Sequence, residues 1–174
     1  AITQNADDDE GLGGVSNRFG GGVAIVDGAT ATIAGCNVSY NAFPGGSANQ
    51  VEYFGGIAVY DSNAVTISDT LVGHNEAKHH AGVAVESSQV SLHRVTLRGN
   101  VGKEGGGFYA GVSDNSDDDA GSDVHLYDCV FEGNTATRTG SNKAGGGGMQ
   151  VSESNVWVYG GTFSGNVASN DRGH

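Results

Sequence analysis

The side chains of this sequence that could do chemistry include an oxygen-rich acidic run between residues 114 and 123. Asn115, Asp117, Asp119 and Asp123 stand at alternate positions in this run, as the ligands of a calcium loop do. The run lacks the bidentate glutamate that closes an EF-hand loop, and a solvated acidic loop is the favoured interpretation. Calcium is therefore a possible ligand, and no cofactor is required.

Two other polar stretches allow weaker interpretations. His74, His79 and His80 could offer imidazoles to a transition metal, although surface histidines without a metal are the favoured alternative. The acidic run from Asp7 to Glu10 is most simply a solvated charged segment.

Lyase or epimerase chemistry on acidic sugars needs a cation for the sugar carboxylate and a base for the C5 proton. His93, Arg94, Arg98 and Tyr127 are the best candidates for these roles. The sequence has only 8 Lys and Arg residues and a formal net charge of −12, which would repel a polyuronate without calcium. No serine- or cysteine-based catalytic set is discernible, so a non-enzymatic protein is favoured and catalysis stays the alternative.

Aromatic side chains recur at fixed distances from two asparagines. His125 and Tyr127 stand nine and seven residues before Asn134, and Trp157 and Tyr159 stand at the same distances before Asn166. If successive repeats lie side by side, these four residues form one exposed ligand-binding face. The face could stack sugar rings, be covered by an insertion loop, or contact another subunit.

Five repeats must position these side chains. Each repeat begins with a pair of small residues and ends at an asparagine. The pairs are Gly21-Gly22, Gly55-Gly56, Ala81-Gly82, Gly106-Gly107 and Gly147-Gly148. The asparagines are Asn41, Asn75, Asn100, Asn134 and Asn166. The distance from the second residue of the pair to the asparagine is 19, 19, 18, 27 and 18 residues, which is close to constant in four repeats.

Within each repeat, apolar residues alternate with polar ones, which indicates strands and not helices. Positions ten, eight and three residues before the asparagine are apolar in every repeat and should face one shared interior. Short strands repeated without intervening helices predict an all-β parallel β-helix of about five coils, stacked ~4.8 Å apart. The recurrent asparagines suit turns and can form a stacked amide ladder.

The predicted β-helix domain covers residues 20–174, and residues 1–19 are an N-terminal cap or extension. Extra residues fall between Asn41 and Gly56, between Asn134 and Gly148, and from Ser113 to Ser122. These segments are expected to be insertion loops that leave the coils at turns.

The two cysteines, Cys36 and Cys129, both stand five residues before an asparagine, in the first and fourth repeats. Three coil spacings separate them by ~14 Å, whereas a disulfide needs Cα atoms within ~7 Å. We therefore expect two free, buried thiols.

Composition excludes several classes of protein. The 31 glycines come with a single proline, which excludes collagen, and frequent glycine disfavours helical bundles. The charge of −12 disfavours nucleic acid as a partner. No apolar run approaches the ~20 residues that a membrane-spanning helix needs.

The glycine pair with following aliphatic residues, and Phe-x-x-Asn at Phe131 and Phe163, resemble the repeat of chlamydial-type polymorphic outer membrane proteins. More broadly, the sequence from Gly20 to Asn166 resembles the right-handed parallel β-helix of the pectate-lyase-like superfamily. Val38, Val72 and Leu97 replace the aromatic residue in the other three repeats. The resemblance implies a right-handed β-helix, cell-surface display and adhesion.

The expected function is a non-enzymatic extracellular or cell-surface structural and adhesive module. Its terminal strand edges invite self-association, head-to-tail into filaments, or contact with a cell-surface or glycan partner. The alternative is a carbohydrate-binding or polysaccharide-active β-helix that uses the aromatic face.

Overall fold

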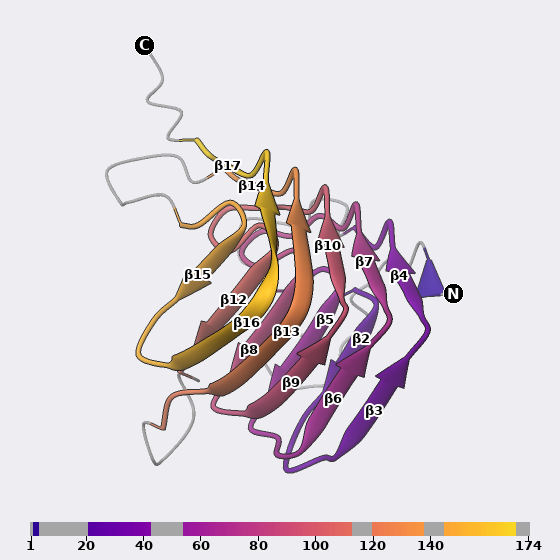
Figure 1. Ribbon diagram of the computed structural model, residues 1–174, viewed down its shortest axis with the longest axis vertical. Helices are drawn as coiled ribbons and strands as arrows, with labels where there is room; N and C mark the ends of the chain where they lie inside the picture. The colour runs from indigo at the N-terminus through magenta and orange to yellow at the C-terminus, as the bar shows by residue number, and fades with distance from the viewer. Residues whose placement is uncertain (1, 4–20, 43–53, 113–119, 138–144, 170–174) are drawn as a thin grey trace, which may run out of the picture.

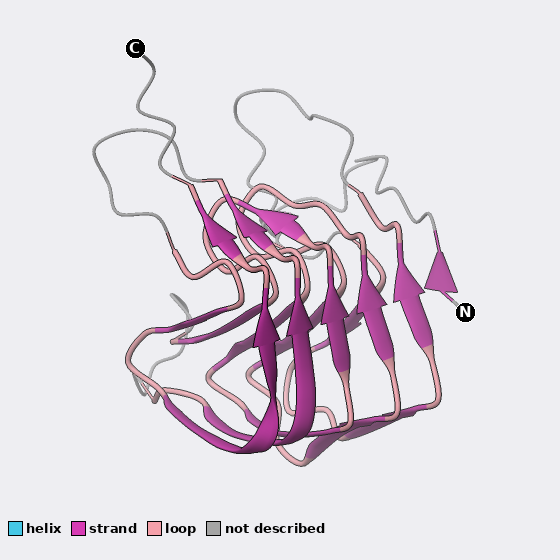
Figure 2. Ribbon diagram, turned by 45° about the horizontal axis from the view of Figure 1, so that its top comes forward, coloured by secondary structure: helices cyan, strands magenta, loops and turns pink. Residues whose placement is uncertain are grey.

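A computed structural model describes residues 2–3, 21–42, 54–112, 120–137 and 145–169. The described residues form strands and turns with no helix, and hence none that could cross a membrane (Figure 2). All of the paired strands run parallel, in three sheets, so the predicted all-β parallel architecture is confirmed.

Nine strands make the largest sheet, which curls through two sections (Figure 1). One section contains β3 (Ala31–Ala34), β6 (Val65–Ser68) and β9 (Gln89–His93). The other contains β1 (Ile2–Thr3), β4 (Asn37–Ser39), β7 (Leu71–Gly73) and β10 (Thr96–Arg98). The long strands β13 (Asp123–Glu132) and β16 (Asn155–Ser164) run through both sections.

Two smaller sheets hold the remaining strands. The five-stranded sheet contains β2 (Val23–Ile25), β5 (Ile57–Tyr60), β8 (Val83–Glu86), β12 (Phe108–Gly111) and β15 (Met149–Val151). The three-stranded sheet contains β11 (Val101–Gly102), β14 (Thr135–Ala136) and β17 (Val167–Ala168).

Strand register pairs each residue with its equivalent in the next repeat. Val90 pairs with Val65 on one side and with Val124 on the other, and Val124 pairs with Val156. The same register places Leu92 between Ile67 and Leu126. Residues at the same position in successive repeats, which we call a column, are therefore neighbours in space and form a row along the stack.

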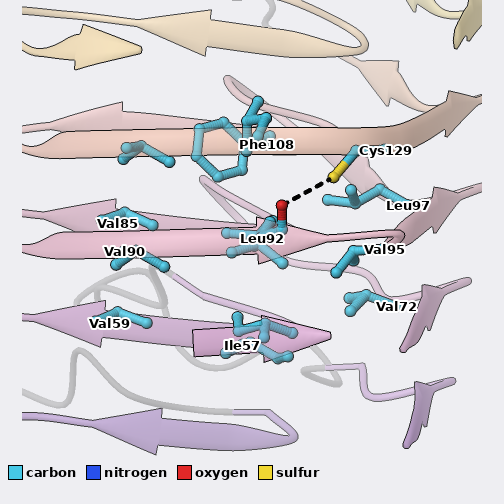
Figure 3. Packing of buried hydrophobic residues seen from close by; sticks show 14 of the residues in the cluster. Ile57, Val59, Val72, Val85, Val90, Leu92, Val95, Leu97, Phe108 and Cys129 are labelled. Carbon is cyan, nitrogen blue, oxygen red and sulfur yellow. Dashed lines mark hydrogen bonds between the residues drawn. The ribbon is translucent and has the colours of Figure 1, made fainter. Parts of the chain in front are cut away.

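The apolar columns meet inside the curl, where they form one continuous core (Figure 3). Leu92, Leu97, Leu126 and Phe131 have no exposed surface, and Phe108 reaches the same core from the five-stranded sheet. Each such side chain contributes about 1.5–3 kcal/mol through burial. The alternation of apolar and polar residues along a strand thus selects the inner face.

Two expectations about burial need correction. Cys36 and Cys129 are both free, but only Cys129 is buried, whereas Cys36 is partly exposed in the first repeat. Val158 and Phe163 occupy interior columns yet are 46% and 48% exposed. The cause is shared: a residue in a terminal repeat has a described neighbouring repeat on one side only.

The five repeat asparagines form a hydrogen-bonded ladder. The backbone N–H and Nδ2 of Asn75 both donate to Oδ1 of Asn100, at 3.1 and 3.0 Å, and Asn100 donates in the same way to Asn134. Nδ2 of Asn75, Asn100, Asn134 and Asn166 also donates to a backbone carbonyl, which for Asn100 is that of Val72. The ladder runs from Asn41 to Asn166 among the described residues.

The small residues at the start of each repeat make room for this ladder. A Cβ atom on Gly56 would lie 2.4 Å from the Gly82 carbonyl oxygen and 3.0 Å from Nδ2 of Asn75. Such distances are too short for any side chain. The glycine pairs are therefore positions of close approach between successive repeats.

A second ladder, of serines, was not predicted. The backbone N–H of Ser62 donates to Oγ of Ser88 at 2.9 Å, that of Ser88 to Oγ of Ser122, and that of Ser122 to Oγ of Ser154. The sequence carries a signal for it, since Val-x-x-Ser ends at Ser62, Ser88 and Ser154. The insertion in the fourth repeat moves Ser122 out of that spacing.

Replacing Asn100 by alanine should destabilise the fold by about 2–4 kcal/mol, because two buried donors of Asn75 lose their acceptor. Urea unfolding followed by far-UV circular dichroism measures the loss. Asn155→Ala is the matched control: the Asn155 side chain is exposed and donates one exposed hydrogen bond, to Asp123, so its removal should change stability by less than about 0.5 kcal/mol. Equal effects of the two substitutions would contradict a structural role for the ladder.

Candidate functional site

The predicted aromatic residues lie together on the outer face of the nine-stranded sheet. His125 stacks on Trp157 with ring centroids 4.6 Å apart, and Tyr127 stacks on Tyr159 at 4.9 Å. His93 extends the second row, because its ring lies 4.6 Å from that of Tyr127. We call these five residues the aromatic face.

The rings of the aromatic face lie parallel to one another, with angles of 7° to 11° between the stacked planes. They stack along the direction in which the strands are stacked, so most ring faces are already covered by a neighbouring ring. Carbohydrate stacking needs an open ring face. Among the described residues, the outer faces of Trp157 and Tyr159 have no further ring on them, and these side chains are 41% and 48% exposed.

At the other end of the rows, the large rings give way to small side chains. His125 pairs with Ser91, and Ser91 pairs with Thr66. A groove of about 320 Å³ lies here, lined by these three residues together with Gln89 and Asp123. Nδ1 of His125 is buried without a hydrogen-bond partner, whereas the Asp123 carboxylate accepts a 3.0 Å hydrogen bond from Asn155.

The predicted catalytic cations are held by carboxylates. Arg94 donates from Nε and a terminal nitrogen to both oxygens of Asp69, at 2.6 and 2.8 Å. These hydrogen bonds lower the pKa of Asp69 and raise the pKa of Arg94. Arg98 is paired with Glu132 at 2.8 Å. His93 and Tyr127 are thus together, but both nearby guanidinium groups already bind a carboxylate of this chain.

The three histidines of the metal hypothesis do not converge. The His74 ring stacks on Tyr40 with centroids 5.1 Å apart, and Nδ1 of His79 lies 3.6 Å from the Glu104 carboxylate. The His80 ring lies 6.1 Å from that of His79 but packs beside Phe54, in a separate apolar cluster with Ala58 and Ala84. The described part of the chain contains no group of three or more histidine, cysteine or acidic side chains that could hold a metal ion.

His80 is buried, with 4% of its surface exposed, so the surface interpretation is wrong for this residue. Its ring stacks on Tyr109 with centroids 3.7 Å apart and lies 5.8 Å from Phe54. Nδ1 accepts a hydrogen bond from the Gly105 N–H at 3.4 Å, which requires the unprotonated nitrogen. Burial, with a smaller contribution from His79, lowers the pKa of His80 to about 3.

Three of the four calcium candidates lie outside the described residues. They are Asn115, Asp117 and Asp119, and the acidic run from Asp7 to Glu10 lies outside the described residues too. Asp123 is exposed at the start of β13. Of the predicted N-terminal cap or extension, Ile2 and Thr3 are described, and they pair parallel with β4.

His80 should make stability depend on pH. Its pKa is 6.5 in the unfolded chain and about 3 when folded, so the unfolded chain binds more protons between these values. Stability should therefore fall as pH decreases below 6.5, by up to about 1.4 kcal/mol per pH unit from this residue. Unfolding free energies from pH 8 to pH 4 measure the slope, which His80→Gln should flatten. An unchanged slope in that variant would exclude His80 as its source.

Comparison with known protein families, with curated proteins and with solved structures finds no match to this chain.

Proposed function

We propose that this chain is a right-handed parallel β-helix of about five coils that serves as a non-enzymatic structural and adhesive module. The hand follows the general preference of parallel crossover connections. The parallel pairing of equivalent strands and the shared core support the arrangement in coils. The sequence resemblance to surface-displayed β-helices supports an extracellular or cell-surface location.

The structural role is supported above all by the hydrogen bonds that the repeated polar side chains make between repeats. The asparagines and serines that recur in the repeats donate and accept hydrogen bonds between successive repeats. Buried, satisfied ladders of this kind specify register and add stability, and they leave these groups no role toward a substrate. Arg94 and Arg98, the best candidates for binding an acidic sugar, are paired with Asp69 and Glu132.

Carbohydrate binding is the second candidate, and two observations favour it. Trp157 and Tyr159 are exposed apolar rings at the end of the aromatic face. The groove beside His125 carries the hydroxyls of Thr66 and Ser91 and the polar groups of Gln89 and Asp123, which suit the hydroxyls of a neutral sugar. An acidic sugar would be repelled by the charge of −12 unless calcium were present.

A glycan array combined with a uronate-lyase assay, both run with and without calcium, separates the two functions. The structural role predicts no lyase activity and no glycan binding that depends on the aromatic face. Trp157→Ala and Tyr159→Ala test the exposed rings, and Ser91→Arg fills the groove beside His125. Tyr40→Ala is the control, since Tyr40 is an exposed ring (58%) outside the aromatic face.

Glycan binding that is lost in Trp157→Ala, Tyr159→Ala or Ser91→Arg but kept in Tyr40→Ala would establish carbohydrate recognition. Lyase activity that disappears on changing His93 or Tyr127 would overturn the non-enzymatic role.

A further inference from the structure

Among the described residues, no strand covers the outer side of the last repeat, and we call this end of the stack the tail. Along β16, Trp157, Val158, Tyr159 and Phe163 are 41% to 48% exposed. Their equivalents one repeat earlier include Leu126 and Phe131, which have no exposed surface at all. In the part of the chain that the structure describes, the tail therefore exposes the cross-section of an apolar core, a surface that soluble proteins normally cover.

The tail also has the groups that a further layer of strands would use. β16 pairs with β13 on one side and with no described strand on the other. A hollow of about 410 Å³ opens there, lined by Met149, Phe163 and Asn166. Asn166 is the last rung of the asparagine ladder among the described residues. A matching partner must supply parallel strands with apolar residues at alternate positions.

We infer that the tail binds the opposite end of a second copy of this chain, head-to-tail, by addition of parallel strands. This inference rests on the structural role proposed above and names the partner that the role involves. The head is the edge formed by β2 and β3, which have no described strand on their outer side.

The head and the tail have complementary shapes. Continuing the register of the repeats places Val156 on Ala31, Trp157 on Thr32, Val158 on Ile33 and Tyr159 on Ala34. Large side chains of one copy then lie over small side chains of the other. Ala31 and Ile33 are partly exposed at the head and pack against the same core columns, so the core becomes continuous from copy to copy.

Charge opposes this contact at one place, because the continued register brings Glu153, in the turn after β15, beside Asp27, in the turn after β2. Neither β16 at the tail nor β2 and β3 at the head contain a charged residue. The rest of the repulsion between copies comes from the net charge of −12, and salt screens both contributions. Association should therefore strengthen as ionic strength increases.

β1 limits the contact. Ile2 and Thr3 pair with Val38 and Ser39 of β4 and so occupy the layer that Phe163 and Ser164 of the incoming copy would take. Complete docking requires β1 to leave β4. The pairing covers only two residues, which makes this displacement feasible and gives β1 the role of a partial block on assembly.

Sedimentation velocity over a wide concentration range at low and high salt, combined with the emission of Trp157, tests the contact. Trp157 is the only tryptophan and lies in the proposed interface, so its emission should move to shorter wavelength as copies associate. Val158→Glu at the tail should weaken association at least about tenfold. Val101→Glu is the matched control, because Val101 is 37% exposed but lies in β11, away from both ends.

Mixing two blocked variants tests the orientation. Thr32→Glu with Ala34→Glu blocks the head, since both residues are exposed on β3, and Val158→Glu blocks the tail. Each variant alone should stay monomeric, and an equimolar mixture should give dimers and nothing larger. Circular dichroism melts verify that every variant is folded. Dimers of the head-blocked variant alone would mean tail-to-tail pairing and would overturn the inference.

Deletion of residues 1–3 tests the role of β1. The shortened chain should associate more tightly than the full chain, and weaker association would overturn the proposed register. A wild-type monomer at every concentration and salt would overturn head-to-tail docking itself. That result would leave the structural role standing, since glycan binding and lyase assays test that role whatever the oligomeric state.

Discussion

Parallel pairing of each residue with its equivalent in the next repeat is the constraint on which the rest of this structure depends. Val90, for example, pairs with Val65 and Val124, the residues at the same position in the two adjacent repeats. The side chain at a given position therefore lies one strand spacing from the side chain at that position in the next repeat. Like side chains then become neighbours: apolar columns merge into one core, asparagines into a ladder and rings into stacks. A residue that suits one repeat is favourable only if it also suits its neighbours.

The same constraint explains why the aromatic face is a poor sugar platform along most of its length. Rings that project from equivalent positions of stacked strands meet face to face, as Tyr127 and Tyr159 do, and present their edges to solvent. Open ring faces remain only where a row stops. The surfaces of this sheet that are open to a ligand or partner are therefore at the ends of rows. One is the groove beside His125, where the next residue of the row is Ser91, and the other is the tail at Trp157.

Several features could be predicted because they depend on spacing alone. The columns, the parallel pairing and the neighbour relations of His125, Tyr127, Trp157 and Tyr159 all follow from counting back from each asparagine. The serine ladder was equally periodic but was missed, because the insertion before Ser122 breaks the Val-x-x-Ser spacing. The burial of His80 was missed, although Phe54 bridges to it and stands at the equivalent position, two residues before the second residue of the small pair. The Tyr109 ring that stacks on His80 comes from a different position of its repeat, so spacing does not reveal that contact.

The sequence by itself determined which residues share a row and which face of a strand turns inward, since both follow from a period of two repeated at nearly constant intervals. Only the tertiary structure decided how much of each row is covered. Cys36 and Phe163 have the same pattern as their buried equivalents, yet they are partly exposed because burial requires a neighbour on both sides. It also decided that Arg94 and Arg98 are neutralised: each shares a row with its carboxylate partner, but only the folded geometry brings the charged groups within hydrogen-bond distance.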